Sequence, residues 1–111
     1  MSVKGYYIIY TTVDSEPEAE RIARRLVEEK LAACVSIVGG VKSVYWWRGR
    51  VEESREYMLM IKTSASKLRE VVEKLKSIHP YETPEIIAVP VAAGFKGYLE
   101  WIDESLGEKK E

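Results

Sequence analysis

The sequence predicts an α+β protein of the ferredoxin-like class, with the element order βαββαβ, an antiparallel sheet and an extra C-terminal helix. Apolar residues switch along the chain between the period of two that is typical of strands and the helical period of about 3.6. The two helical stretches fall where a split βαβ unit needs its crossovers. Because such crossovers are right-handed, the first strand is expected in the centre of the sheet and the fourth at an edge.

The first predicted strand covers residues 5–13 and reads GYYIIYTTV. Its β-branched and aromatic residues occupy both parities, which favours burial on both faces. A helix follows, because Ser15 and Glu18 form a capping box and Pro17 suits the first helical turn. The apolar stripe of this helix comprises Ala19, Ile22, Ala23, Leu26 and Val27.

A long hairpin comes next. Residues 31–38 predict a strand, Gly39-Gly40 indicates a bend or bulge, and the stretch continues extended to Trp47. Arg48-Gly49-Arg50 reads as a hairpin turn, and residues 56–63 predict the returning strand. Arms of about ten residues exceed the usual strand length.

Three aromatic residues stand side by side near the tip of this hairpin: Tyr45, Trp46 and Trp47. Consecutive strand residues point to opposite faces, and a two-layer fold has one core face. A lone chain therefore leaves at least one tryptophan in water. We expect these three residues to be buried against another copy of the chain, the alternative being a tip that packs on its own domain.

The second helix is predicted from Ser64 and ends near His79, because Pro80 disfavours the α conformation of the residue before it. Residues 85–92 predict a strand, and Pro90, which has no N–H, places this strand at a sheet edge. The second helix carries the stripe Leu68, Val71, Val72, Leu75 and Ile78, and a last helix carries Phe95, Tyr98, Leu99, Ile102 and Leu106.

Composition limits the classes of function. The chain has 111 residues, a net charge of −1 and one cysteine, Cys34. We expect one domain over residues 1–111 without a disulfide framework, and no nucleic-acid partner. With neither a signal-peptide pattern nor an apolar run of about 20 residues, we expect a cytoplasmic protein without a membrane partner. Asn and Gln are absent, and Asp14 and Asp103 are the only Asp residues, which predicts thermostability.

Catalytic motifs are lacking. No orienting group or known signature accompanies Cys34 and His79, and no phosphate-binding glycine loop occurs, so we expect no enzyme and no catalytic residues. Residues 56–63 lack the aromatic and basic pattern of RNA-recognition modules, which share this topology. Met58 and Met60 point the same way along this strand, as core filling or as soft ligands for copper.

Three segments, LAACVSI, YWWRGRVEESREYMLMIKT and HPYETPEI, in this order and with these separations, closely resemble the CutA divalent-cation tolerance family. The resemblance covers residues 7–101. It implies a ferredoxin-like homotrimer with inward-facing sheets, strands that add across subunit boundaries, and a role in copper and other divalent-metal binding and response. The alternative is a small-molecule-binding signalling trimer like the PII proteins, without a physiological metal.

The resemblance also implies site residues. Cys34 stands in the family's AAC segment, and His79, Tyr81 and Glu82 stand in its HPY block. If copper or another divalent cation binds, we expect weak binding through His79, with Glu82 and Cys34 as partners, because the chain offers one His and one Cys. The alternatives are a cap or cleft-wall role for His79 and a small buried hydrophobe at Cys34.

A second kind of site is a cleft between subunits that binds a small anion or nucleotide. Arg48, Arg50 and Lys62 are candidates by charge, and Tyr81 of the HPY block joins them.

Overall fold

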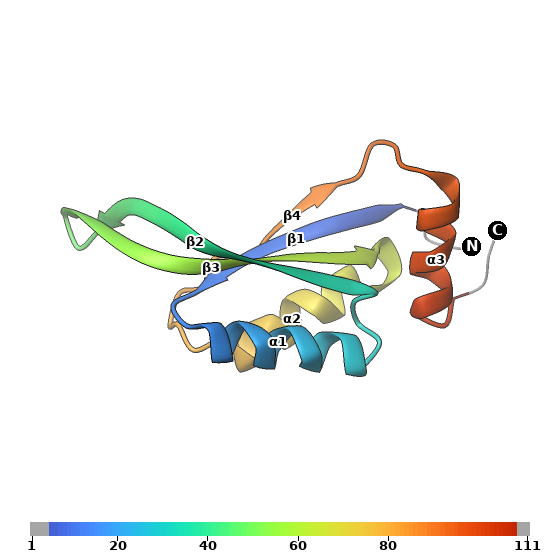
Figure 1. The fold of residues 1–111 in the computed structure, drawn as a ribbon, viewed down its shortest axis with the longest axis horizontal. Coiled ribbons are helices and arrows are strands. Elements are labelled where there is room, and N and C mark those ends of the chain that lie inside the picture. Colours follow the sequence, from blue (N-terminus) through green and yellow to red (C-terminus); the bar gives the residue numbers. More distant parts are fainter. Residues whose placement is uncertain (1–4, 109–111) are drawn as a thin grey trace.

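The computed structural model describes residues 5–108, which form one four-stranded antiparallel sheet with helices (Figure 1). The strand order is β2-β3-β1-β4, so β1 is central and β4 lies at an edge, as predicted. This confirms the predicted α+β class and its element order. The elements are β1 (Tyr6–Val13), α1 (Glu16–Glu28), β2 (Cys34–Trp47), β3 (Arg50–Ser64), the 3-10 helix η1 (Ala65–Lys67), α2 (Leu68–Ile78), β4 (Ile87–Pro90) and α3 (Lys96–Ser105).

The main core lies between one face of the sheet and the helices α1 and α2, which cover that face side by side (Figure 1). The Ser15 hydroxyl accepts a hydrogen bond from the Glu18 N–H (3.3 Å) and caps α1. Helix α2 ends at Ile78 because His79 is extended (φ −73°, ψ 136°) ahead of Pro80. Fully buried core side chains include Ile9, Leu59 and Ile61 of the sheet and Ile22, Leu26, Val71 and Leu75 of the helices.

Helix α3 stands at the end of the sheet where β1 begins (Figure 1). Its Ile102 is buried with Ala33 in a second, small core. The Tyr6 hydroxyl donates a 2.7 Å hydrogen bond to Asp103, which raises the pKa of Tyr6 to about 12. The predicted stripe is only partly correct. Ile102 and Leu106 are buried, whereas Tyr98 is 42% exposed and Phe95, which precedes the helix, is 80% exposed.

Two other expectations need correction. The last strand is shorter than residues 85–92, since its ladder with β1 runs only from Ile87 to Pro90. The first strand is not fully buried on both faces. Ile9 is fully buried on the helix side, whereas Ile8 and Tyr10 on the other side are only half-buried.

The sheet face away from the helices is open in a single chain. Met58 and Met60 lie on it, half-buried, and are therefore not part of the core between sheet and helices. At one end β2 and β3 continue past the helices as a two-stranded arm, the outer hairpin (residues 41–56), which the figure shows projecting from the body (Figure 1). Arg48 (φ 50°) and Gly49 (φ 78°) form its two-residue turn, which confirms the predicted turn.

Candidate functional site

A bulge in β2 decides which side chains of the outer hairpin face the site. Val38 pairs with Met58 but Val41 pairs with Glu56, so β2 has one more residue than β3 between these two pairs. Because alternate residues face opposite sides, one extra residue exchanges the faces of everything beyond it. Before the bulge, odd-numbered residues such as Ile37 pack on the helix side. After the bulge, the odd-numbered residues of β2 lie with Glu56 on the opposite face of the sheet, the one away from the helices.

The bulge is built on the predicted glycine pair. Gly40 adopts φ 72°, a left-handed conformation that glycine takes without steric cost. Gly39 lies close to the Tyr57 ring, where a Cβ atom would be 3.1 Å from a ring carbon. The sequence thus predicted the bulge correctly.

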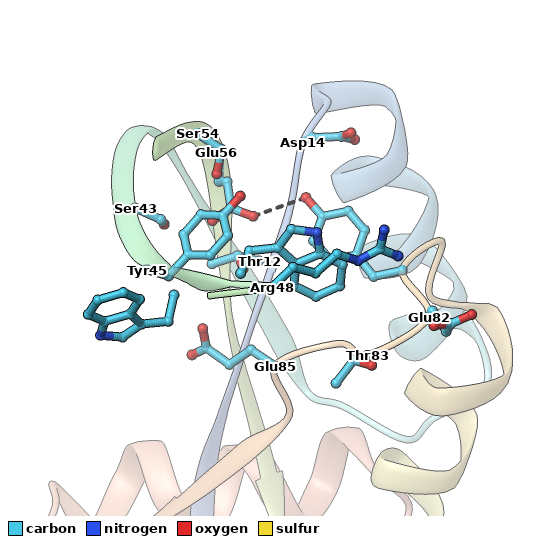
Figure 2. A pocket seen from close by; sticks show the side chains of 13 residues that line it. Thr12, Asp14, Ser43, Tyr45, Arg48, Ser54, Glu56, Glu82, Thr83 and Glu85 are labelled. Carbon is cyan, nitrogen blue, oxygen red and sulfur yellow. Dashed lines mark hydrogen bonds between the residues drawn. The ribbon is translucent and has the colours of Figure 1, made fainter. Parts of the chain in front are cut away.

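A pocket of about 800 Å³ lies where β1 ends and the outer hairpin continues alone (Figure 2). Figure 2 shows Tyr45 and Glu56 on the hairpin side and Glu82 and Thr83 on the side of the loop that follows α2. The lining combines four aromatic residues (Tyr45, Trp46, Trp47, Tyr81), four carboxylates (Asp14, Glu56, Glu82, Glu85), four hydroxyl groups (Thr12, Ser43, Ser54, Thr83) and Arg48.

His79 does not line this pocket, but its ring contacts Tyr81, which does, and it is 8% exposed. The Tyr81 N–H donates to His79 Nδ1 (3.1 Å), so the proton sits on Nε2, which donates to the Thr12 carbonyl oxygen (3.0 Å). Burial lowers the pKa of His79 below its usual value, against the opposing effect of the Thr12 carbonyl. Among nearby charges, Arg21 also lowers this pKa, whereas Glu18 and Glu56 raise it. His79 is therefore a neutral imidazole with both ring nitrogens engaged.

Tyr81 continues this chain of contacts into the pocket. Its ring meets the His79 ring edge-on at 4.9 Å between centroids, and its hydroxyl donates a 3.0 Å hydrogen bond to Glu56 Oε2. Burial first, and then this bond, raise the pKa of Tyr81 well above its usual range. Glu56 is only 6% exposed. The HPYE segment thus fastens the loop after α2 to both β1 and β3.

The structure does not bring the three predicted metal ligands together. Cys34 pairs with Lys62, which pairs with Ile8, whereas His79 binds Thr12, four residues further along β1. Four strand residues span about 13 Å. Within residues 5–108 no three His, Cys, Asp or Glu side chains are grouped so as to hold a metal ion. One chain by itself therefore does not fit the predicted metal.

The residues predicted for an anion cleft between subunits do not all lie together in one chain. Arg48 and Tyr81 line the pocket, but Arg50 and Lys62 do not. Lys62 lies at the other end of the sheet, where its ammonium donates to Ser36 (2.5 Å) and contacts the Cys34 sulfur at 3.7 Å. The carboxylates around Arg48 make this pocket a poor match for an anion.

Sequence reasoning missed most of the pocket lining. Glu56 is the clearest case, because it is a carboxylate of β3 on the same parity as Met58 and Met60, the face opposite the helix-side core. A buried carboxylate on such a strand indicates a polar partner. That partner, Tyr81, is 25 residues away, so local pattern alone did not reveal it.

The predicted interface aromatics are uncovered in one chain. Trp46 is 73% exposed, Trp47 47% and Tyr45 41%, and Val44 and Val51 of the same arm are also exposed. Such a concentration of apolar surface is typical of a protein interface. None of the helices in the described part of the chain is both long and apolar enough to cross a bilayer.

Comparison with known proteins points to one family. The family described as CutA1 divalent ion tolerance protein matches residues 7–105. A curated relative from Archaeoglobus fulgidus, named divalent-cation tolerance protein CutA, is 48% identical over 98 residues, or 88% of this chain and 95% of that one. A relative of the same name from Thermus thermophilus is 46% identical over 100 residues, or 90% and 97% of the two chains.

Solved structures agree. The structure of the periplasmic divalent cation tolerance protein CutA from Archaeoglobus fulgidus superposes with a TM-score of 0.88 and 46% identity, covering 91% of this chain and 98% of that one. That of divalent ion tolerance protein CutA1 from Ehrlichia chaffeensis gives a TM-score of 0.89 at 30% identity, covering 95% and 98%.

Proposed function

This chain belongs to the CutA1 divalent ion tolerance protein family, and we propose that it acts as a cytoplasmic homotrimer that binds copper or another divalent cation weakly and serves tolerance to such ions. The family match confirms the resemblance that the sequence motifs predicted. The relatives' names describe tolerance and no reaction, so the proposed role involves no catalytic turnover.

The observation that carries the assembly is the uncovered outer hairpin. Trp46 is 73% exposed, Val44 61% and Val51 59% in one chain. Removing such surface from water is worth about 25 cal/mol per Å², so a second copy that covers it gains substantially. The number of subunits, three, is inferred from the family resemblance. The open sheet face with Met58 and Met60 supports it, because the resemblance implies that the sheets face inward in the trimer.

Light scattering coupled to size exclusion tests the assembly. At micromolar concentration the particle should weigh three times the 12.7 kDa of the chain. A monodisperse monomer would overturn the proposal.

The metal part of the proposal requires ligands from more than one subunit. Cys34 and His79 are far apart in one chain, and either ring nitrogen of His79 must give up a hydrogen bond before it can bind a metal. Both facts support weak binding, with Cys34, His79 and Glu82 as the candidate ligands.

Calorimetric titration of Cu(II) tests this arrangement in the assembled wild type and in the variants His79→Ala and Cys34→Ala. We expect weaker binding in both variants, with the oligomer intact. Unchanged affinity in His79→Ala would remove the histidine from the site, and sub-nanomolar binding by wild type would contradict a weak site.

The pocket favours a second candidate function, a small-molecule-binding signalling trimer. Its volume of about 800 Å³ lies within the usual range for small-ligand sites. A screen by thermal shift distinguishes the two roles, because a specific rise in melting temperature with an organic compound favours the signalling role.

A further inference from the structure

Helix α3 carries an aromatic surface that its own chain leaves uncovered. Phe95 is 80% exposed, and Tyr98 and Trp101 are each 42% exposed. The rings of Tyr98 and Trp101 stack at 5.5 Å between centroids. The ring of Phe95 lies against Gly97, where a Cβ atom would be 2.8 Å from a ring carbon. Because residues three apart are neighbours on a helix, the three rings form one surface, the α3 aromatic face (Phe95, Tyr98, Trp101).

The outer hairpin carries a second uncovered surface, on the side of the ribbon opposite to Tyr45 and Trp47. Trp46 pairs with Val51, and Val44 lies two residues before Trp46 on β2, so these three side chains share one side. They are the most exposed apolar side chains of the hairpin. We refer to them as the hairpin apolar face (Val44, Trp46, Val51).

The charges beside the two faces are opposite in sign. Residues 44–51 carry two arginines and no carboxylate, whereas residues 95–105 carry three carboxylates and one lysine. Within residues 5–108 neither Arg50 nor Glu100 forms an ion pair. Opposite charges favour contact between two surfaces and fix their register, whereas like charges oppose it. A contact between two hairpins, or between two α3 helices, would therefore bring like charges together.

The two faces lie at opposite ends of the chain (Figure 1). The chain measures 49 Å along its longest axis, so one subunit cannot bring its own hairpin onto its own α3. A second copy supplies the complementary face in equal number. A contact between two unlike faces joins copies head to tail, and such contacts close into a ring when the rotation between subunits allows it.

We propose that the hairpin apolar face of one subunit docks on the α3 aromatic face of the next, with Trp46 against the ring of Phe95 and the arginines of the hairpin beside the carboxylates of α3. Made three times, this contact closes the ring and covers both surfaces at every junction. The inference rests on the proposed homotrimer and adds to it the surface of the neighbour that receives the hairpin.

Thiol cross-linking of the full chain tests the contact. In a Cys34→Ser background, Val51→Cys and Phe95→Cys together should let a short bis-maleimide join neighbouring subunits into covalent dimers and trimers, because each junction then holds one thiol from each side. The matched control pairs Val51→Cys with Glu20→Cys, on the exposed surface of α1, and its chains should run as monomers on a denaturing gel.

Light scattering before the reaction separates this contact from the trimer itself. A trimer that cross-links equally in both variants, or in neither, would overturn the docking and leave the homotrimer standing. A monomeric wild type would overturn both.

Truncation of the two facing rings gives a measurement that needs no introduced thiol. Phe95 is 80% exposed, so Phe95→Ala should leave the fold of the chain intact and raise the concentration at which the oligomer dissociates about tenfold or more, as loss of a central aromatic contact does. Trp46→Ala removes the other half of the same contact, so the double variant should change this concentration by less than the product of the two single changes. Glu20→Ala is the control and should dissociate as wild type does. Wild-type dissociation of Phe95→Ala, or single changes that multiply fully, would refute the docking.

Discussion

At the scale of single residues, His79 is the most constrained side chain of the HPY segment. Its two ring nitrogens hold Thr12 and Tyr81, and its burial lowers its pKa. Protonation would add the ring's second hydrogen, at Nδ1, and so break the bond from the Tyr81 N–H. The neutral ring therefore holds the loop that carries Tyr81 and Glu82 at the pocket.

Stability should depend on pH through this histidine. The pKa of His79 in the folded protein lies below the usual 6.5, so the unfolded chain binds the proton more readily. The contribution of the neutral ring to folding stability is therefore complete above pH 6.5 and is lost as pH falls through the folded pKa. Denaturant unfolding of wild type and His79→Asn from pH 7.5 to 5 measures it. The wild type should lose more free energy of unfolding over this interval, and parallel curves would contradict the assignment.

Thr11 offers a second test at this scale. Its hydroxyl is buried and, among the described residues, has no hydrogen-bond partner. Thr11→Val keeps the shape and removes the unpaired group, so it should raise the free energy of unfolding by about 1 kcal/mol.

Thr63→Val is the matched control for that change. Thr63 is equally buried, but its hydroxyl donates a 2.7 Å hydrogen bond to the Leu31 carbonyl. The free energy of unfolding of this variant should be about 1 kcal/mol lower than that of wild type. A loss of stability in both variants would mean that the hydroxyl of Thr11 has a hydrogen-bond partner.

At the scale of elements, the sequence predicted the order, the turn and the bulge, because periodicity, Arg48-Gly49 and Gly39-Gly40 are local features. It did not predict which face the outer hairpin presents, because a one-residue shift leaves an alternating pattern intact. The pocket was missed for a related reason. Glu56 and Tyr81 meet only through the fold, across 25 residues of chain.

The bulge itself can be tested at Gly40. Its φ of 72° strains any residue with a Cβ atom, so Gly40→Ala should cost about 1–2 kcal/mol of unfolding free energy. Gly40→Asn is the control, because asparagine tolerates this conformation better, and it should cost less. Equal losses in denaturant unfolding would show that backbone strain is not the cause.

At the scale of the whole molecule, the chain is elongated, with extents of 49 × 26 × 23 Å, because the outer hairpin projects from the body (Figure 1). The sequence predicted the long arms and an exposed tryptophan, but it did not predict that the hairpin projects from the body. It could not supply the relative placement of Cys34 and His79, which depends on how β1, β2 and β3 are registered. That placement is why a site within one chain is ruled out for those two residues.

Truncation of the exposed aromatics should weaken assembly. If Trp46 or Trp47 lies in the interface core, Trp46→Ala or Trp47→Ala should cost on the order of 3–5 kcal/mol per subunit. Sedimentation over a range of concentrations would then show dissociation at much higher protein concentration than for wild type. Val27→Ala, on the outer side of α1, is the control and should assemble normally. Wild-type behaviour of both tryptophan variants would place the interface elsewhere.

The extra residue in β2 has a consequence for how such a gene can change. Loss of one in-frame codon at the glycine pair would alter no other amino acid, yet it would turn Tyr45 and Trp47 to the opposite side of the ribbon and bring Trp46 round in their place. All the β2 side chains beyond the bulge would change faces in a single mutational event. Insertions and deletions at this point therefore act on the pocket and on the aromatic surface together, whereas a point substitution reaches one side chain at a time.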